Sequence, residues 1–155
     1  MGQNRRAASW LAAVVALAGC TPGAALAPSD HNAAGNALVI AMSLVKYGQS
    51  ASPFGTVQAY NPSIVTVATG ATIQFRNDDA FSHTATMISG AFPASNMFQS
   101  SALSPNGHDL TTAAWSTGDV AGNGFSQTLV ASTPGTYLYG CYHHYPTMRG
   151  VIIVQ

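Results

Sequence analysis

Three residues that can bind a soft metal ion lie close together near the C-terminal end of the sequence. Cys141, His144 and Met148 offer a thiolate, an imidazole and a thioether on one short segment. His83 offers a second imidazole from an upstream turn at 77–82. Two imidazoles and a thiolate, with a thioether as a weak axial ligand, form the trigonal donor set that suits copper and electron transfer. The four residues therefore predict a site for one copper ion.

Each of these residues has a simpler alternative. Cys141 could be a buried apolar thiol, His83 a hydrogen-bonded turn residue, and Met148 a part of the core. His143 competes with His144 for the metal. A Cys-x-x-His step suits one metal ion better than a Cys-x-His step, so we expect His143 to face solvent or a partner. The other methionines of the domain are expected in the core: Met42, Met87 and Met97.

The sequence around these residues resembles a known family. Pro-Gly-Thr-Tyr at 134–137 leads into a strand that ends at Cys141, and Asn-Asp-Asp at 77–79 precedes His83. With the Cys-x-x-His-x-x-x-Met loop, this pattern resembles the blue copper proteins of the plastocyanin and amicyanin group, the cupredoxins. The resemblance covers about residues 37–155, apart from one insert.

The resemblance implies one copper ion that alternates between Cu(I) and Cu(II). It also implies that His83, Cys141 and His144 are the strong equatorial ligands and that Met148 is the weak axial ligand. The loop between His144 and Met148 is one residue longer than in amicyanin-like relatives and one shorter than in plastocyanin-like ones, so the axial position is where this chain departs from the pattern. From its family position, Thr84 is expected to hydrogen-bond across to the Cys141 loop.

The chain from residue 37 onward predicts an all-β fold. Short apolar and β-branched segments alternate with turn signals, which indicates an antiparallel sandwich, and Ile73 and Phe75 share one face of their strand. The family resemblance makes this a Greek-key β-sandwich of about eight strands. The expected strands are 38–45, 56–60, 64–67, 72–76, 83–89, 126–131, 136–141 and 151–155. A long polar insert at about 90–124 could hold a short helix or an extra hairpin, and inserts of this length are often functional.

The first residues resemble an export signal. Arg5 and Arg6 precede an apolar run over 10–18, which is too short to span a bilayer. The run ends in Leu-Ala-Gly-Cys at 17–20, which resembles the lipobox of bacterial lipoproteins. That resemblance implies cleavage before Cys20 and lipid attachment to its thiol.

The alternative is an ordinary signal that is cleaved near Ala25 or Ala27, with the first cysteine discarded. On the lipoprotein interpretation, the chain divides into a signal peptide at 1–19, a flexible tether at 20–36 and a cupredoxin domain at 37–155. We expect an extracytoplasmic location, periplasmic or at the cell surface, with membrane contact only through the lipid anchor.

The number of cysteines also supports a metal site at Cys141. Because Cys20 is either lipidated or removed, Cys141 has no disulfide partner. A lone thiol in an oxidising compartment is a liability unless something occupies it.

Charged residues are sparse beyond the signal. Three cations and five aspartates leave a net charge of −2 from residue 21 onward. This excludes a basic surface for nucleic acid and favours partners that dock with little dependence on salt. We expect a monomer that meets redox proteins through an apolar patch around His144. Its rim is expected to consist of Ala80, Phe81, Tyr142, Tyr145 and Pro146.

Together these features predict a type 1 copper protein that shuttles single electrons between extracytoplasmic redox partners. An enzyme is not expected, because four ligands leave no open position for substrate. In addition, Gly140 and Tyr142 flank Cys141, where multicopper oxidases and copper nitrite reductases carry a histidine. The main alternative is a copper chaperone or resistance protein without electron transfer. A sandwich without metal would leave the Cys-x-x-His-x-x-x-Met loop unexplained.

Overall fold

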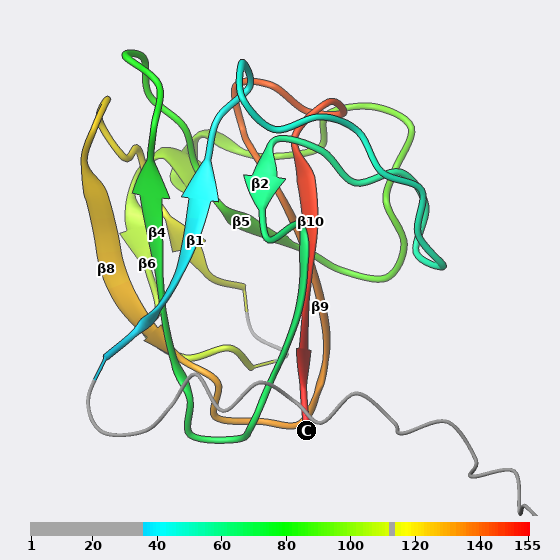
Figure 1. Ribbon diagram of the computed structural model, residues 1–155, viewed down its shortest axis with the longest axis vertical. Coiled ribbons are helices and arrows are strands. Elements are labelled where there is room, and N and C mark those ends of the chain that lie inside the picture. Colours follow the sequence, from blue (N-terminus) through cyan, green and yellow to red (C-terminus); the bar gives the residue numbers. More distant parts are fainter. Residues whose placement is uncertain (1–35, 112–113) are drawn as a thin grey trace, which may run out of the picture.

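The computed structural model describes residues 36–111 and 114–155. The predicted export signal, Cys20 and the tether up to residue 35 lie outside these residues. The described part of the chain is a sandwich of two β-sheets, which confirms the all-β prediction (Figure 1). Among the described residues there is no helix that is long and apolar enough to cross a membrane.

The first sheet has four strands in the described chain, in the order β2-β1-β4-β8. Its strands are β1 (Leu38–Met42), β2 (Tyr60–Asn61), β4 (Thr72–Asn77) and β8 (Phe125–Val130). Strand β4 alternates between half-buried and buried residues, and Ile73 and Phe75 are fully buried, as predicted. This alternation places one face of the sheet against the core.

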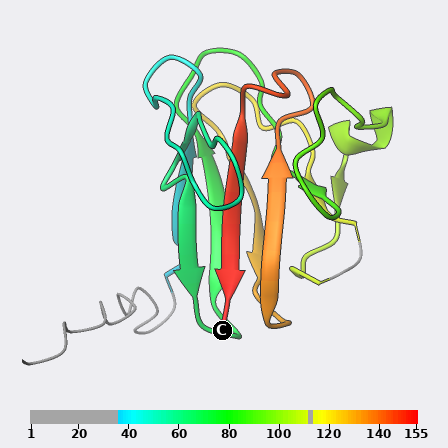
Figure 2. The same ribbon diagram turned by 90° about the vertical axis from the view of Figure 1, so that its right-hand side faces the viewer.

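The second sheet has six strands in the described chain, in the order β3-β10-β9-β5-β7-β6. Its strands are β3 (Ile64–Val67), β5 (Thr86–Ile88), β6 (Pro105–Asn106), β7 (Ser116–Thr117), β9 (Gly135–Gly140) and β10 (Arg149–Val154). Strands β9 and β10 are antiparallel along their whole length. Figure 2 shows that the loop joining them lies at the end of the sandwich opposite the C-terminus.

Aromatic rings fill the space between the two sheets. Tyr139 packs edge-on against Tyr60, with ring centroids 4.7 Å apart, and against Phe75 at 5.3 Å. Such pairs contribute about 0.5–1.5 kcal/mol each beyond the area they bury. Met42 is fully buried, as expected, and Met87 packs against this core. The core therefore joins β1, β2 and β4 of the first sheet to β5 and β9 of the second.

Some details of the fold differ from the sequence prediction. Two strand pairs are parallel, β1 with β4 and β3 with β10, whereas the sequence predicts an antiparallel sandwich. The sequence does not predict these pairs because the alternation of residues does not reveal the direction of a partner strand. The expected strand at 56–60 is mostly loop, and the one at 83–89 is shortened to β5.

The insert at 90–124 belongs to the sandwich. It contains the short 3₁₀ helix η1 (Ser100–Leu103), and β6 and β7 pair as a hairpin that continues the second sheet beyond β5. Leu110 and Trp115 anchor it in the core. Met97, expected in the core, is 53% exposed, because it lies on the outer loop of the insert.

Candidate metal centre

The segment 141–148 closes on itself between β9 and β10. The backbone N–H of Met148 donates to the carbonyl of His144 at 3.1 Å, and the N–H of Cys141 donates to the carbonyl of Met148 at 3.2 Å. These bonds turn the chain back, so that Cys141 and Met148 are neighbours in the fold. A side chain at Gly140 would lie 2.9 Å from the Tyr145 ring and 3.0 Å from the Met148 carbonyl, which explains the glycine before the cysteine.

His83 lies in the connection between β4 and β5, and Asn77 shapes this connection. The Asn77 amide donates to the carbonyls of Phe81 at 2.7 Å and Val120 at 2.9 Å. His83 and Val120 also exchange two backbone hydrogen bonds, of 3.2 and 2.8 Å. The last part of the insert therefore holds His83 in place, and the side chain of His83 is fully buried.

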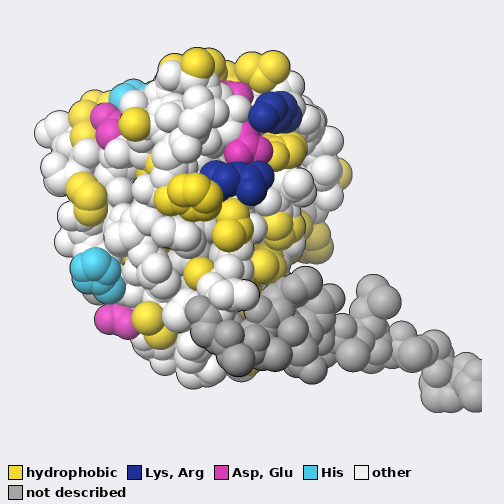
Figure 3. All heavy atoms as spheres, turned by 60° about the vertical axis from the view of Figure 1, so that its left-hand side comes forward, with side chains coloured by type: hydrophobic (Ala, Val, Ile, Leu, Met, Phe, Trp, Pro, Cys, Tyr) yellow, Lys and Arg dark blue, Asp and Glu magenta, His cyan; other side chains and the backbone are white. Residues whose placement is uncertain are grey.

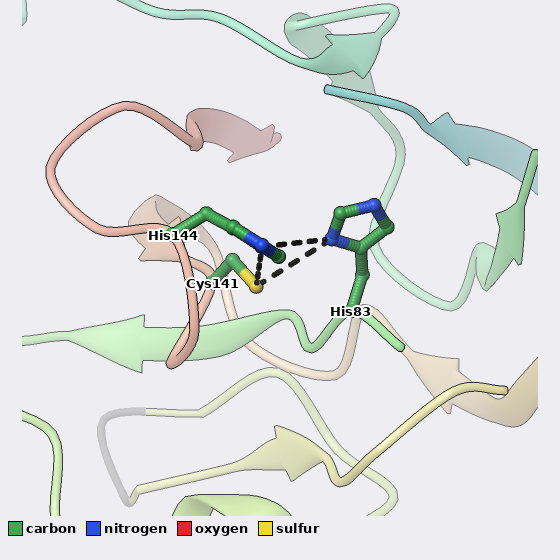
Figure 4. Close-up of side chains that lie close together, drawn as sticks. All are labelled: His83, Cys141 and His144. Atoms are coloured by element: carbon green, nitrogen blue, oxygen red, sulfur yellow. Dashed lines mark hydrogen bonds between the residues drawn. The ribbon is translucent and has the colours of Figure 1, made fainter. Parts of the chain in front are cut away.

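The structure brings three of the four predicted residues together (Figure 4). Nδ1 of His83 lies 3.1 Å from Nδ1 of His144 and 3.8 Å from Sγ of Cys141. Nδ1 of His144 lies 3.5 Å from the same sulfur. Two imidazole nitrogens and one thiol sulfur thus converge on one point, as a single small ion requires.

Burial favours the neutral forms of these groups. It lowers the pKa of His83, and it lowers that of His144 together with repulsion from His83. Burial also raises the pKa of Cys141, although hydrogen bonds from Thr84 act against this. Neutral imidazole is the form that binds metal, whereas the thiol must lose its proton, so metal binding should release a proton from Cys141.

Met148 and His143 occupy different environments. Met148 is fully buried in the same apolar cluster as Cys141, a position that suits an axial ligand and core packing alike. His143 is exposed and is not part of the cluster of candidate ligands, and its Nε2 lies 2.6 Å from a carboxylate oxygen of Asp119. Its exposure confirms the expectation that His143 faces solvent.

Thr84 links the two segments that form the centre. Its backbone N–H donates to Sγ of Cys141 at 3.3 Å, and its hydroxyl accepts the N–H of Tyr142 at 2.8 Å. This confirms the predicted hydrogen bond from Thr84 to the cysteine loop. A donor to the sulfur also holds the thiolate in one direction.

Asp79 was not singled out by the sequence analysis. One carboxylate oxygen lies 2.9 Å from Nε2 of His83, and the other accepts the Ser43 hydroxyl at 2.5 Å. Burial acts to raise the pKa of Asp79, but hydrogen bonds from Ser43 and His83 lower it overall. The signal in the sequence was an acidic residue four positions before the candidate ligand.

The surface around His144 differs in one respect from the predicted rim. Phe81 is 44% exposed, and its ring centroid lies 5.5 Å from that of His144. Ala80 and Pro146 are exposed as well. Tyr145 was wrongly placed in the rim: it is buried, because the insert covers it.

The first part of the insert packs on the loop 141–148. The hydroxyl of Tyr145 donates to the Pro93 carbonyl, and its ring lies edge-on to Phe98 at 5.6 Å. The side-chain amide of Asn96 donates to the Tyr142 carbonyl at 2.7 Å. The insert therefore supports the outer side of the loop that carries three of the four predicted ligands.

Comparison with known families identifies the class of protein. Residues 51–155 match the family described as copper binding proteins, plastocyanin/azurin family. The chain therefore belongs to this family, and copper is its cofactor. The residues present fit this ion, because a thiol and two imidazole nitrogens converge within 4.8 Å of one another.

Solved structures share the fold. A reduced mutant of amicyanin is 21% identical with a TM-score of 0.51, over 80% of this chain and 87% of that one. A reduced Cu(I) form of another amicyanin mutant, at pH 4, is 22% identical with a TM-score of 0.50 and the same 80% and 87% coverage. At these identities the likeness shows the cupredoxin fold alone.

A copper-containing nitrite reductase (NirK) from Thermus scotoductus SA-01 is 18% identical, with a TM-score of 0.49 over 77% of this chain. This chain spans only 22% of that enzyme's length. The search of curated proteins gave no match.

Proposed function

We propose that this chain is a mononuclear type 1 copper protein that shuttles single electrons between extracytoplasmic redox partners. Its ligands are His83, Cys141 and His144, with Met148 as the weak axial ligand. The observation that carries the proposal is the convergence of two Nδ1 atoms and one Sγ atom at distances of 3.1 to 3.8 Å. This is the donor set of copper electron-transfer sites.

The contacts that hold these ligands in place suit electron transfer. Bound copper supplies one-electron chemistry between Cu(I) and Cu(II). His83 and Cys141 are fully buried, and the Thr84 hydrogen bonds tie their two segments together. Side chains held in this way can move little when the charge of the ion changes, which keeps the reorganisation small.

Electrons are proposed to enter and leave through His144. Its ring is partly exposed, whereas that of His83 is not. Exposed Phe81, Ala80 and Pro146 provide an apolar surface beside it, of the kind that often marks a partner site. Charged residues are sparse along the chain, and most of the face displayed in Figure 3 is uncharged apart from one group of basic and acidic side chains and a few single ones. Docking beside His144 would therefore depend weakly on salt.

The remaining expectations belong to the same proposal. The protein acts as a carrier and not as an enzyme, because four ligands leave no position for substrate. It is a monomer outside the cytoplasm, tethered through a lipid on Cys20. The sequence pattern at 17–20 supports this tether.

One experiment tests the proposal against its alternatives. The purified chain is loaded with Cu(II), and its visible spectrum and reduction potential are recorded. We expect an intense thiolate charge-transfer band and a reversible one-electron couple, and Cys141→Ser should abolish the band. Colourless, exchangeable Cu(I) binding would instead indicate a chaperone, and no binding would indicate a sandwich without a metal role.

A second pair of variants tests the axial ligand. Met148→Leu should keep the thiolate band but change the potential, because the axial ligand tunes it. The control is Met87→Leu, a half-buried methionine packed against the core. If both variants leave the potential unchanged, Met148 is core packing only.

A further inference from the structure

The imidazole of His83 contacts a buried carboxylate on the side that faces away from the metal centre. Nδ1 is directed at His144 and Cys141, and the second ring nitrogen lies on the opposite edge of the ring (Figure 4). That nitrogen, Nε2, is 2.9 Å from Oδ2 of Asp79. The Asp79 side chain is only 4% exposed, so solvent screens this contact weakly.

The carboxylate of Asp79 is itself held by the end of the first sheet. Oδ1 accepts the hydroxyl of Ser43 at 2.5 Å, and Oδ2 also accepts the backbone N–H of Leu44 at 2.7 Å. The backbone N–H of Asp79 donates to the side chain of Asn77 at 2.9 Å. These bonds fix the orientation of the carboxylate, and the ring of His83 must follow it.

This arrangement has two consequences for His83. Nε2 must carry the ring proton in order to donate to the carboxylate, which leaves the lone pair of Nδ1 free for a metal ion. A carboxylate that accepts this proton also makes the other ring nitrogen a stronger donor. In addition, a fixed negative charge close to a metal centre favours the more highly charged ion.

The neighbouring carboxylate has a different role. Asp78 pairs with Arg76 at 2.6 Å and accepts the hydroxyl of Tyr47 at 2.7 Å. Among the described residues, the ion-pair partner of Asp79 is His83. Two adjacent aspartates therefore carry equal charge, but only one of them contacts a candidate ligand.

We propose that Asp79 is a positioning residue that fixes the ring and tautomer of His83 and lowers the reduction potential of the copper site. This inference rests on the proposed function, because it takes His83 as a ligand. It assigns the Ser43–Asp79–His83 chain of hydrogen bonds a role in setting the potential in addition to stabilising the fold.

The test compares Asp79→Asn with Asp78→Asn. The amide oxygen can replace Oδ2 as acceptor for His83 and Leu44, so the first variant keeps the shape and loses the charge. Its affinity for Cu(II) should fall by about 10- to 100-fold, the usual effect of losing such a partner. The affinity for Cu(I) should fall less, and each tenfold difference between the two raises the potential by about 59 mV.

The control, Asp78→Asn, changes the net charge equally without touching His83. It should leave the potential nearly unchanged. Equal shifts in the two variants, or no shift in Asp79→Asn, would overturn the proposal.

A measurement on the unmodified protein covers the case in which Asp79→Asn does not fold. In the diamagnetic Cu(I) form, the Nε2 proton of His83 should give a downfield NMR signal that exchanges slowly with solvent. Its absence would also overturn the proposal. Failure of the proposed function is distinguishable, because the unmodified protein would then lack the thiolate band altogether.

Discussion

The loop 141–148 and the segment 77–84 both bring side chains to the candidate metal centre, but they are held in different ways. The loop is closed by its own backbone hydrogen bonds, between Cys141 and Met148 and between Met148 and His144. The segment depends on residues far along the chain. Val120 pairs with the backbone of His83, and the end of β1 holds the carboxylate behind its ring.

This difference shows that the two regions contribute differently to the centre. The loop supplies three candidate ligands that chain connectivity keeps close, and the insert packs on its outer side. The segment supplies one candidate ligand and the contacts that fix its direction, and Thr84 then joins it to the loop. The precision of the centre therefore depends most on the segment that contributes fewest ligands.

The largest effect is expected from removing one imidazole in each region. His144→Gly and His83→Gly should both lose the thiolate band at equal copper concentrations. Added imidazole should restore it only in His144→Gly, because His144 is partly exposed whereas His83 is fully buried. A titration with imidazole, followed in the visible spectrum, checks this. Equal restoration in both variants would contradict the proposed difference in access.

A smaller effect is expected at the link between the two regions. Thr84→Val leaves the N–H of Tyr142 without its acceptor and should lower the free energy of unfolding by about 1–3 kcal/mol. Thr136→Val, at an exposed position of β9, is the matched control and should change little. Urea denaturation of both variants measures the difference. Equal stability would mean that the link contributes nothing.

A further effect is expected if the segment 77–84 is part of the surface on which a redox partner docks. Phe81→Glu should slow electron self-exchange about tenfold, equivalent to about 1.4 kcal/mol, because two like charges then meet beside His144. Phe125→Glu, at the start of β8 and also exposed, is the control. NMR line broadening of mixed oxidation states gives the rates, and copper content is measured alongside. Equal rates for both variants would remove Phe81 from the docking surface.

The smallest effect concerns acid stability. Hydrogen bonds from Arg76 and Tyr47 hold the pKa of Asp78 at about 2, below its ordinary value of 3.8. The stabilisation is therefore complete above the ordinary value and is lost as the pH falls through about 2. Asp78→Asn should flatten the stability profile over this range, as measured by urea unfolding at several pH values. An unchanged profile would show that this pairing does not stabilise the segment.

Much of the loop could be predicted from the sequence. The short spacing of Cys141, His144 and Met148 between two strands predicts that they lie close together. The Cys-x-x-His spacing, which favours His144 over His143 as the ligand, also predicts the exposure of His143. Tyr145 was misplaced because nothing in the loop itself reveals that the insert covers it. Its partners, Pro93 and Phe98, lie about fifty residues earlier in the chain.

The sequence by itself determined the class of fold and the residues available to bind copper. The alternation along 72–76 and the Cys-x-x-His-x-x-x-Met loop are patterns of residues that are close in the sequence. Such patterns can be recognised without knowing how the chain packs. Only the tertiary structure decided which group contacts Nε2 of His83. Asp79 lies four residues before His83, so the two are neighbours in the sequence, but the orientation of its carboxylate depends on Ser43 and Leu44 at the end of β1. Contacts between residues so far apart follow from the packing of the sheets and not from the spacing of residues.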